Sequence, residues 1–257
     1  MDNSLKLITF DVTGTLIQFK GDLAQDLVEI GEKYGIATVT LDQVGEATKI
    51  QWKLQSESDP HFGTCWKSWW TEFVIGTFER ILSDNEPAKI NLHKIAEDFM
   101  TRFCVGERCT LLPHVVETLH EIKTHFPTIV LGVITNFDSR SHRILHDTGI
   151  RPYFDFVLVS HEAQISKPDP SIFSLALTSA SQLGKNGEIL PQNAVHIGDN
   201  YRLDCLSAAD SGWRSIYVGG HKTSSDLEER DGIYCTEGMQ NVTIMLKEQF
   251  KTINISS

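Results

Sequence analysis

The stretch Leu5-Lys-Leu-Ile-Thr-Phe-Asp-Val-Thr-Gly-Thr15 decides how the fold begins. Its apolar part, from Leu5 to Phe10, is typical of a buried strand, and it ends abruptly in a polar turn that contains a glycine. Asp11 is therefore expected directly at the carboxyl end of a strand, which is where parallel sheets bind their ligands. A single strand cannot bury itself, so the rest of the chain has to supply the sheet that it joins.

From residue 110 onward, predicted strands alternate with predicted helices. Apolar runs predict strands at 129–134, 156–159, 194–197 and 215–218, and helices are predicted at 113–124, 140–147, 170–181 and 203–211. Such alternation is typical of a parallel sheet covered by helices on both faces. We therefore expect an α/β fold with a doubly wound, Rossmann-like parallel sheet.

The segment between the first strand and this alternating region is predicted to be helical. Leu23, Leu27 and Ile30 recur at helical spacing, and Thr40 with Gln43 forms a capping-box pattern. Four aromatic residues form a stripe at helical spacing, namely Trp66, Trp69, Trp70 and Phe73. We expect this stripe to pack in the core of the helical segment; the alternative is that it faces a substrate. The expected domains are a core (1–17 and 110–257) and an inserted helical domain (18–109).

Composition excludes several classes of protein. The 257 residues carry 23 Lys+Arg and 34 Asp+Glu, a net charge of −11, and 40% hydrophobic residues are enough for a packed core. The chain has no block of basic residues of the kind that binds nucleic acid, and no apolar run reaches the ~18 residues of a membrane helix. The start of the chain lacks a signal-peptide pattern, and the five cysteines contain no CxxC pair, so we expect a cytoplasmic protein.

Four polar signals follow the predicted strands in order. They are Asp11, then Thr135-Asn136, then Lys167, then Asp199 with Asp204. Carboxylates that lie close together repel unless a cation separates them, and oxygen ligands suit Mg²⁺. Lys167 and Thr135 would face a phosphate as charge and hydrogen-bond donor, and Asp11 could act as a nucleophile. The set therefore indicates phosphoryl transfer from a small phosphorylated substrate.

Each signal alone has a structural explanation as well. Asp169 followed by Pro170 can simply begin a helix, and Asp204 can be a charge in a first helical turn. Asp138 could touch the phosphate loop, as could Asn136, but Asp138 is equally well placed to cap a helix before Ser139. The joint occurrence of all four signals, each after a strand, favours the functional interpretation.

With these motifs in hand, the chain resembles the haloacid dehalogenase (HAD) superfamily over nearly its whole length. Residues 8–16 resemble the first motif, 134–136 the second, 167–170 the third, and 197–199 with Asp204 the fourth. The helical insert resembles a C1-type cap. The resemblance implies that Asp11 is the nucleophile, that Thr135 and Lys167 bind the phosphoryl group, and that Lys167 also orients Asp11. It also implies that Mg²⁺ is held by Asp11, the Thr13 backbone carbonyl and Asp199, with Asp204 as ligand or supporting acid.

One residue departs from the pattern of the phosphatases in that superfamily. They usually carry a second Asp two residues after the nucleophile, as acid and base, and here that position is Thr13. General acid–base help is worth ~10²–10⁴-fold in rate, so a weak phosphatase or phosphotransferase is expected. The alternatives are a catalytically impaired regulatory or phospho-ligand-binding protein, and a true haloacid dehalogenase. The sequence leaves the oligomeric state open.

Overall fold

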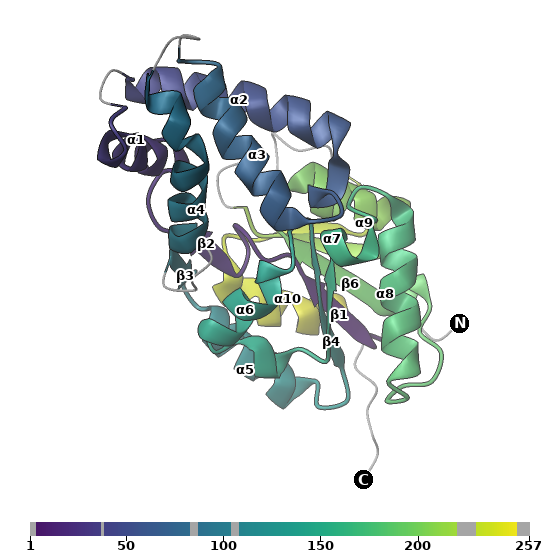
Figure 1. The fold of residues 1–257 in the computed structure, drawn as a ribbon. Coiled ribbons are helices and arrows are strands. Elements are labelled where there is room, and N and C mark those ends of the chain that lie inside the picture. Colours follow the sequence, from purple (N-terminus) through teal and green to yellow (C-terminus); the bar gives the residue numbers. More distant parts are fainter. Residues whose placement is uncertain (1–3, 37–38, 83–86, 104–107, 220–229, 251–257) are drawn as a thin grey trace.

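The computed structural model describes residues 4–36, 39–82, 87–103, 108–219 and 230–250. At its centre lies a six-stranded sheet in the order β5-β4-β1-β6-β7-β8, with every neighbouring pair parallel. The strands are β1 (Leu7–Phe10), β4 (Val130–Thr135), β5 (Phe156–Val159), β6 (Ala194–Gly198), β7 (Arg214–Tyr217) and β8 (Ile233–Cys235). The predicted α/β class is confirmed, and the first strand lies in the middle of the sheet (Figure 1), where all four of its residues are buried.

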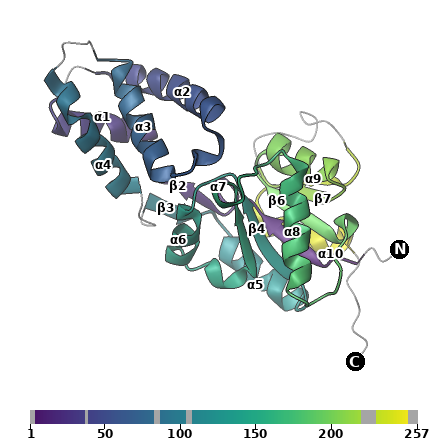
Figure 2. The ribbon, with the colours of Figure 1, turned by 45° about the vertical axis from the view of Figure 1, so that its right-hand side comes forward.

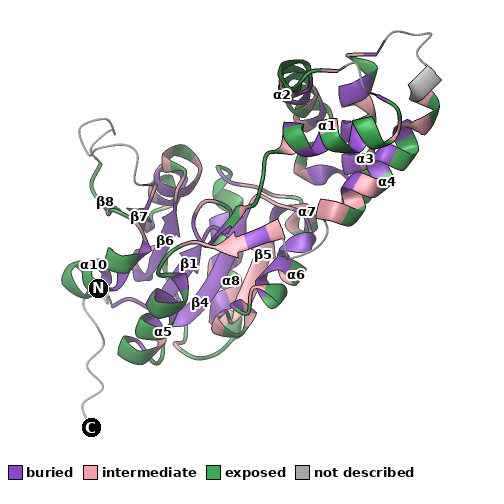
Figure 3. Cartoon of the chain, turned by 90° about the vertical axis from the view of Figure 1, so that its left-hand side faces the viewer, coloured by how far each residue is buried: buried purple, intermediate pink, exposed green. Residues whose placement is uncertain are grey.

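Helices cover both faces of this sheet. On one face lie α5 (Val115–His125), α6 (Arg140–Asp147) and α10 (Val242–Gln249), and on the other α8 (Pro170–Gln182) and α9 (Ser207–Asp210). Successive β1 residues serve opposite faces: Ile8 packs in the first cluster and Leu7 in the second. Figure 3 shows the central strands as buried. Such burial on both faces explains why the strands are mainly apolar.

The predicted helix at 203–211 differs in detail from the observed one. It begins earlier, as a π-helical stretch η6 (Tyr201–Leu206) that runs into α9, because the Asn200 side chain accepts from the Leu203 amide at 3.0 Å. The remaining short elements are α7 (Ser160–Ala163) and the 3₁₀ turns η1 (Pro60–Phe62), η2 (Pro87–Asn91), η4 (Arg151–Tyr153), η5 (Pro191–Asn193) and η8 (Met239–Asn241).

The helical insert forms a separate lobe beside the carboxyl ends of the strands (Figure 2). This helical lobe consists of α1 (Leu23–Lys33), α2 (Leu41–Ser58), α3 (Trp66–Glu79) and α4 (Leu92–Phe103), packed around an apolar cluster of its own. The Thr40–Gln43 capping box is present. Trp69, Trp70 and Phe73 are 2%, 7% and 0% exposed, so the predicted packing role of the stripe is confirmed for them. Of the helices described, none is both long and apolar enough to cross a membrane.

A two-stranded antiparallel ribbon joins the helical lobe to the sheet. It pairs β2 (Ile17–Phe19) with β3 (Cys109–Leu111), and short three-residue strands of this kind left no clear signal in the sequence. The expected boundaries at residues 18 and 109 fall inside this ribbon. The division of the chain at these residues remains a prediction, but the ribbon continues directly from the Asp11 turn and so ties the lobe to that turn.

Candidate active site

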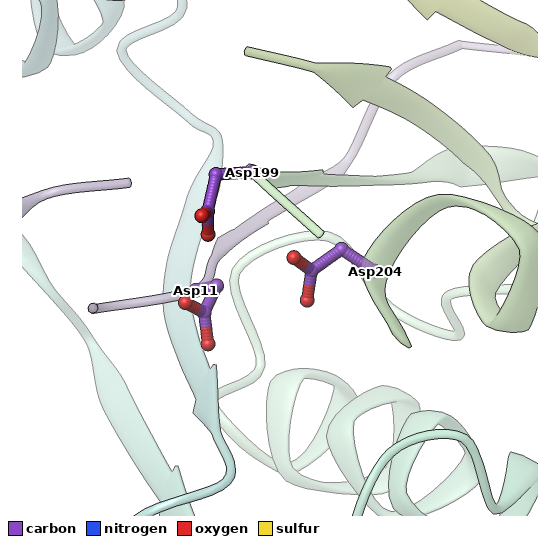
Figure 4. A group of neighbouring side chains, drawn as sticks. All are labelled: Asp11, Asp199 and Asp204. Atoms are coloured by element: carbon purple, nitrogen blue, oxygen red, sulfur yellow. The ribbon is translucent and has the colours of Figure 1, made fainter. Parts of the chain in front are cut away.

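Three carboxylates meet at the carboxyl edge of the sheet. Asp11 follows β1, Asp199 follows β6, and Asp204 lies in η6. One oxygen from each lies within 4.8 Å of the others, and Figure 4 shows the side chains converging. Because β1 and β6 are neighbours in the sheet, their carboxyl ends bring Asp11 and Asp199 together, as the strand pattern predicted.

Two glycines permit this close approach. Gly14 has φ +85°, and a Cβ there would overlap the Asp199 carboxylate. A Cβ at Gly198 would likewise overlap the carboxylate of Asp204. The acidic side chains therefore pack directly against backbone, and no other residue type fits at either position without moving them.

Lys167 places its ammonium among these carboxylates. Its Nζ donates to Asp11 Oδ1 at 2.8 Å, to Asp204 Oδ1 at 2.6 Å and to the Ile134 carbonyl at 2.9 Å. The side chain is only 1% exposed. Asn136 fixes the backbone of the same residue, because its amide accepts from Lys167 N at 2.9 Å and donates to Lys167 O at 2.7 Å. All three ammonium hydrogens therefore have oxygen partners.

Burial and mutual repulsion shift the pKa values of the acids apart. Burial, opposed by Lys167 and reinforced by the charge of Asp204, raises the pKa of Asp11 to about 7. The pKa of Asp199 is also raised, by burial and then by Asp204. Burial acts on Asp204 too, but Lys167 and His196 outweigh it and its pKa is lowered. Asp204 is thus the firmly ionised partner of Lys167, and the other two carboxylates lack sufficient compensating charge.

This donor set fits a divalent cation. It consists of carboxylate oxygens, which hard cations such as Mg²⁺ prefer. Burial, and then the charge of Asp204, raises the pKa values of Asp11 and Asp199 by disfavouring their ionised forms, and a bound cation would stabilise those forms.

The other predicted site residues lie around this centre. Thr135, 2% exposed, ends β4, the strand next to β1. Thr13 is exposed in the turn after Asp11. Asp169 caps α8, accepting from Ser171 N at 2.8 Å, as the structural explanation of that motif predicted.

Asp138 belongs to a different contact, the one between core and helical lobe. It is fully buried and accepts from the Arg140 side chain at 2.6 and 2.8 Å and from Trp70 Nε1 at 2.9 Å. It also accepts from the Arg140 amide at 3.0 Å, at the start of α6. These donors surround its carboxylate and join the start of α6 to the helical lobe, while Ser139, and not Asp138, takes the N-cap position of α6.

Sequence reasoning missed two buried polar residues below the carboxylates, Thr9 and His196. Both are 0% exposed, and their strands pair them, with Thr9 Oγ1 2.8 Å from His196 Nδ1. His196 Nε2 lies 3.3 Å from Asp204 Oδ1. Burial and then Lys167 lower the pKa of His196 to about 4, so the imidazole is neutral. Polar residues inside two otherwise apolar strands were the available signal.

A cavity of about 210 Å³ opens where the helical lobe meets the core. Its core side is formed by Asn136, Ser160 and Ser166, two of which adjoin Thr135 and Lys167 in sequence. The lobe supplies an aromatic wall with a few polar groups, namely Trp52, Ser56, Asp59, Pro60, His61, Phe62 and Trp69. The cavity therefore combines apolar and polar lining next to the loops that carry Thr135 and Lys167.

Comparison with known proteins points to one family. The family described as haloacid dehalogenase-like hydrolase matches residues 5–212. The Rhythmically expressed gene 2 protein of Drosophila melanogaster is 33% identical over 224 residues, 83% of this chain and 82% of that protein. Human haloacid dehalogenase-like hydrolase domain-containing protein 3 is 32% identical over 222 residues, covering 84% and 82%. The 2-haloacid dehalogenase of Pseudomonas syringae pv. Tomato DC3000 shares the fold, with a TM-score of 0.67, 21% identity and coverage of 95% and 99%.

Proposed function

This chain belongs to the haloacid dehalogenase-like hydrolase family, and we propose that it is a Mg²⁺-dependent phosphatase or phosphotransferase. In this proposal the phosphoryl group passes through an aspartyl-phosphate on Asp11. The observation that carries it is the buried ammonium of Lys167, 2.8 Å from Asp11 Oδ1, within a group of three carboxylates. Lys167 binds one oxygen of Asp11 and so leaves the other free to attack.

Mg²⁺ would be held by Asp11, the Thr13 backbone carbonyl, Asp199 and Asp204. When bound, it would offset the negative charge that phosphoryl transfer places on the phosphate oxygens. Asp204 would make the weakest ligand of the set, because its Oδ1 already accepts from Lys167 at 2.6 Å.

The chain's own groups account for the remaining steps. An Asp11 oxygen forms a bond to phosphorus while the bond to the leaving-group oxygen breaks and that oxygen keeps the electron pair. Thr135 binds a phosphoryl oxygen, and the Lys167 ammonium, held beside Asp11, stabilises the charge of the phosphoryl group electrostatically. Water, or an acceptor hydroxyl, then attacks phosphorus and releases the Asp11 carboxylate, with the transferred proton passing to solvent.

Thr13 makes this cycle slow for ordinary alkyl phosphates. A hydroxyl near neutral pH is a poor acid and a poor base, so the leaving group departs without its proton. The loss expected from missing acid–base help is about 3–5 kcal/mol of barrier, equivalent to ~10²–10⁴-fold in rate. Acyl and aryl phosphates need little protonation, and they are the substrates on which activity should be easiest to measure.

The cavity between core and helical lobe supports a small substrate whose leaving group carries an apolar face. Such a group would pack against Trp52 and Phe62 while its phosphate reached the loops of Asn136 and Ser166. We propose a cytoplasmic protein with no nucleic-acid or membrane partner. The free thiols of the described cysteines, Cys65, Cys109, Cys205 and Cys235, suit a reducing compartment.

The test is a phosphate-ester panel with Mg²⁺ on wild type, Asp11→Asn and Thr13→Asp, together with ³²P labelling of the protein from an acyl phosphate. We expect label on wild type, none on Asp11→Asn, and a rate gain of about 10²-fold or more for Thr13→Asp on alkyl phosphates. If no donor labels Asp11, the proposal is wrong.

The second candidate is a catalytically impaired protein that binds a phosphorylated ligand in the same pocket. The observation that favours it is Thr13, exposed in the turn where an acid–base residue would be needed. Negligible turnover by both wild type and Thr13→Asp, together with saturable binding of phosphorylated ligands measured by calorimetry, would favour this candidate over the enzyme.

A further inference from the structure

Two polar side chains in the centre of the sheet take no part in the steps above. Thr9 in β1 and His196 in β6 are fully buried neighbours, joined by the 2.8 Å contact between Thr9 Oγ1 and His196 Nδ1. Burying polar groups in a sheet core destabilises the fold unless they bond well, so an apolar pair would be the simpler choice. Their place below Asp204 suggests a reason for the polar pair.

The proton of the imidazole can be assigned by counting hydrogens. Lys167 Nζ lies 3.5 Å from His196 Nε2, but its three hydrogens point to oxygens at 2.6, 2.8 and 2.9 Å. No lysine hydrogen remains for the imidazole. Nε2 also faces the Asp204 Oδ1 carboxylate oxygen at 3.3 Å, and this nitrogen must carry the proton if the contact is to be attractive. Nδ1 then accepts the Thr9 hydroxyl hydrogen.

We propose that His196 and Thr9 are positioning residues for the Asp11 nucleophile. Thr9 holds the tautomer and ring of His196, His196 donates to Asp204, Asp204 holds Lys167, and Lys167 orients Asp11. The inference rests on the proposed phosphoryl transfer and adds to it a relay that extends into the sheet core.

In this relay, the hydrogen bond from His196 acts by fixing the orientation of the Asp204 carboxylate. Its Oδ2 accepts from the Asn200 amide at 2.9 Å, and its Oδ1 accepts from Lys167 and His196. With donors on both oxygens, rotation of the carboxylate is restricted and Lys167 has one position. Removing the histidine donor frees Oδ1 to follow Lys167, and the distance from ammonium to Asp11 is no longer fixed.

A simple packing role is the competing explanation, since the His196 ring also packs edge-to-face on Phe173 with centroids 5.6 Å apart. Paired variants separate the two. His196→Gln keeps an amide donor near the Nε2 position, whereas His196→Leu keeps volume and loses the donor. Thr9→Ser and Thr9→Val form the corresponding pair, and His142→Gln on the exposed face of α6 is the control.

Kinetics are measured on folded, full-length protein with an aryl phosphate and saturating Mg²⁺. We expect His196→Leu to lower kcat by about 10–100-fold with little change in KM, and His196→Gln to recover most of that loss. Thr9→Val should show a smaller loss of kcat that Thr9→Ser recovers. The proposal is overturned if Gln and Leu lose activity equally or if His196→Leu keeps the wild-type kcat.

A second readout does not depend on turnover. In ¹⁵N-histidine spectra, the resonance absent from His196→Gln identifies His196, and we expect its wild-type pattern to be that of the neutral Nε2–H tautomer. An Nδ1–H pattern overturns the proposal even if the enzyme is active. If wild type shows the Nε2–H tautomer but never forms a phosphoenzyme, the proposed function fails while the relay geometry stands.

Discussion

Two regions of the molecule are stabilised by different kinds of interaction. The charged crevice of the core consists of Lys167 with Asp11, Asp199 and Asp204, and the aromatic cluster of the helical lobe consists of Trp69, Trp70, Phe73 and the rings around them. In the crevice, Lys167 satisfies three oxygens at 2.6–2.9 Å, so each atom has a specified partner. In the lobe, Trp69 and Phe73 stack with ring centroids 5.9 Å apart, inside a cluster held by shape and burial. The first arrangement depends on the identity and direction of single atoms, and the second depends chiefly on filled volume.

The largest effect is expected where the crevice loses its only central cation. Lys167→Met would leave the Asp11 and Asp204 carboxylates without their shared partner in a buried site. We expect a loss of about 3–5 kcal/mol in the free energy of unfolding, along with loss of phosphoenzyme formation. Urea unfolding measures the first. The control is Lys185→Met, which breaks the half-exposed pair with Asp155 and should have an effect below about 1 kcal/mol. Equal losses in both variants would contradict the comparison.

The stability of the aromatic cluster should depend on the volume of the side chains that fill it. Phe73 is fully buried among aromatic rings, so Phe73→Ala should destabilise the protein by about 3–5 kcal/mol through the cavity it leaves. Phe73→Leu, which keeps most of the volume, should have a much smaller effect in the same unfolding measurement. A Leu variant as unstable as the Ala variant would show that ring geometry, and not volume, holds the lobe together.

The two regions meet where Trp70 Nε1 donates to the buried Asp138 Oδ2 at 2.9 Å. Trp70→Phe removes that donor and leaves a smaller aromatic ring, so we expect a loss of about 1.5–3 kcal/mol in the free energy of unfolding and faster amide exchange in both α3 and α6. Trp69→Phe is the matched control, because Trp69 Nε1 donates to the Asp59 carbonyl inside the lobe. Trp69→Phe should speed amide exchange only within the helices of the lobe. Unchanged exchange in α6 of Trp70→Phe would show that this bond does not couple the regions.

The smallest change in stability is expected for Asp199, compared in the absence and presence of Mg²⁺. In metal-free protein the raised pKa of Asp199 means that its ionised form destabilises the fold above that pKa, and the penalty is relieved as pH falls. Asp199→Asn should therefore raise stability at neutral pH by no more than about 1 kcal/mol, because solvent screens a partly exposed carboxylate. Adding Mg²⁺ should raise the Tm of wild type and leave that of Asp199→Asn unchanged. A Mg²⁺-dependent rise in the variant would place the cation elsewhere.

The sequence was sufficient for five of the six strands of the sheet, β8 (Ile233–Cys235) being missed, and for the meeting of Asp11 and Asp199 at its edge. Each predicted strand of the core is a mainly apolar run, and three of the polar signals begin where such a run ends. Parallel strands bring their carboxyl ends to one edge, so Asp11 and Asp199 could be placed together without coordinates. The lobe was recognisable from helical spacing and from the Thr40 capping box, which are local signals.

Short elements and terminal details were missed because their causes are not local. The ribbon strands β2 and β3 are three residues each and pair residues about 90 positions apart, as Ile17 does with Leu111. The early start of η6 depends on one side chain, Asn200. Neither leaves a periodic pattern long enough to stand out from the surrounding loops.

By itself, the sequence determined that carboxylates and a lysine lie at one edge of a parallel sheet, because strand period and topology follow from hydrophobic pattern. Only the tertiary structure decided which atom each group faces. The contacts of Thr9 with His196, Lys167 with Asp11, and Trp70 with Asp138 join residues 187, 156 and 68 positions apart. Hydrogen bonds depend on direction over a few tenths of an ångström, and that precision arises only when the whole core and lobe are packed.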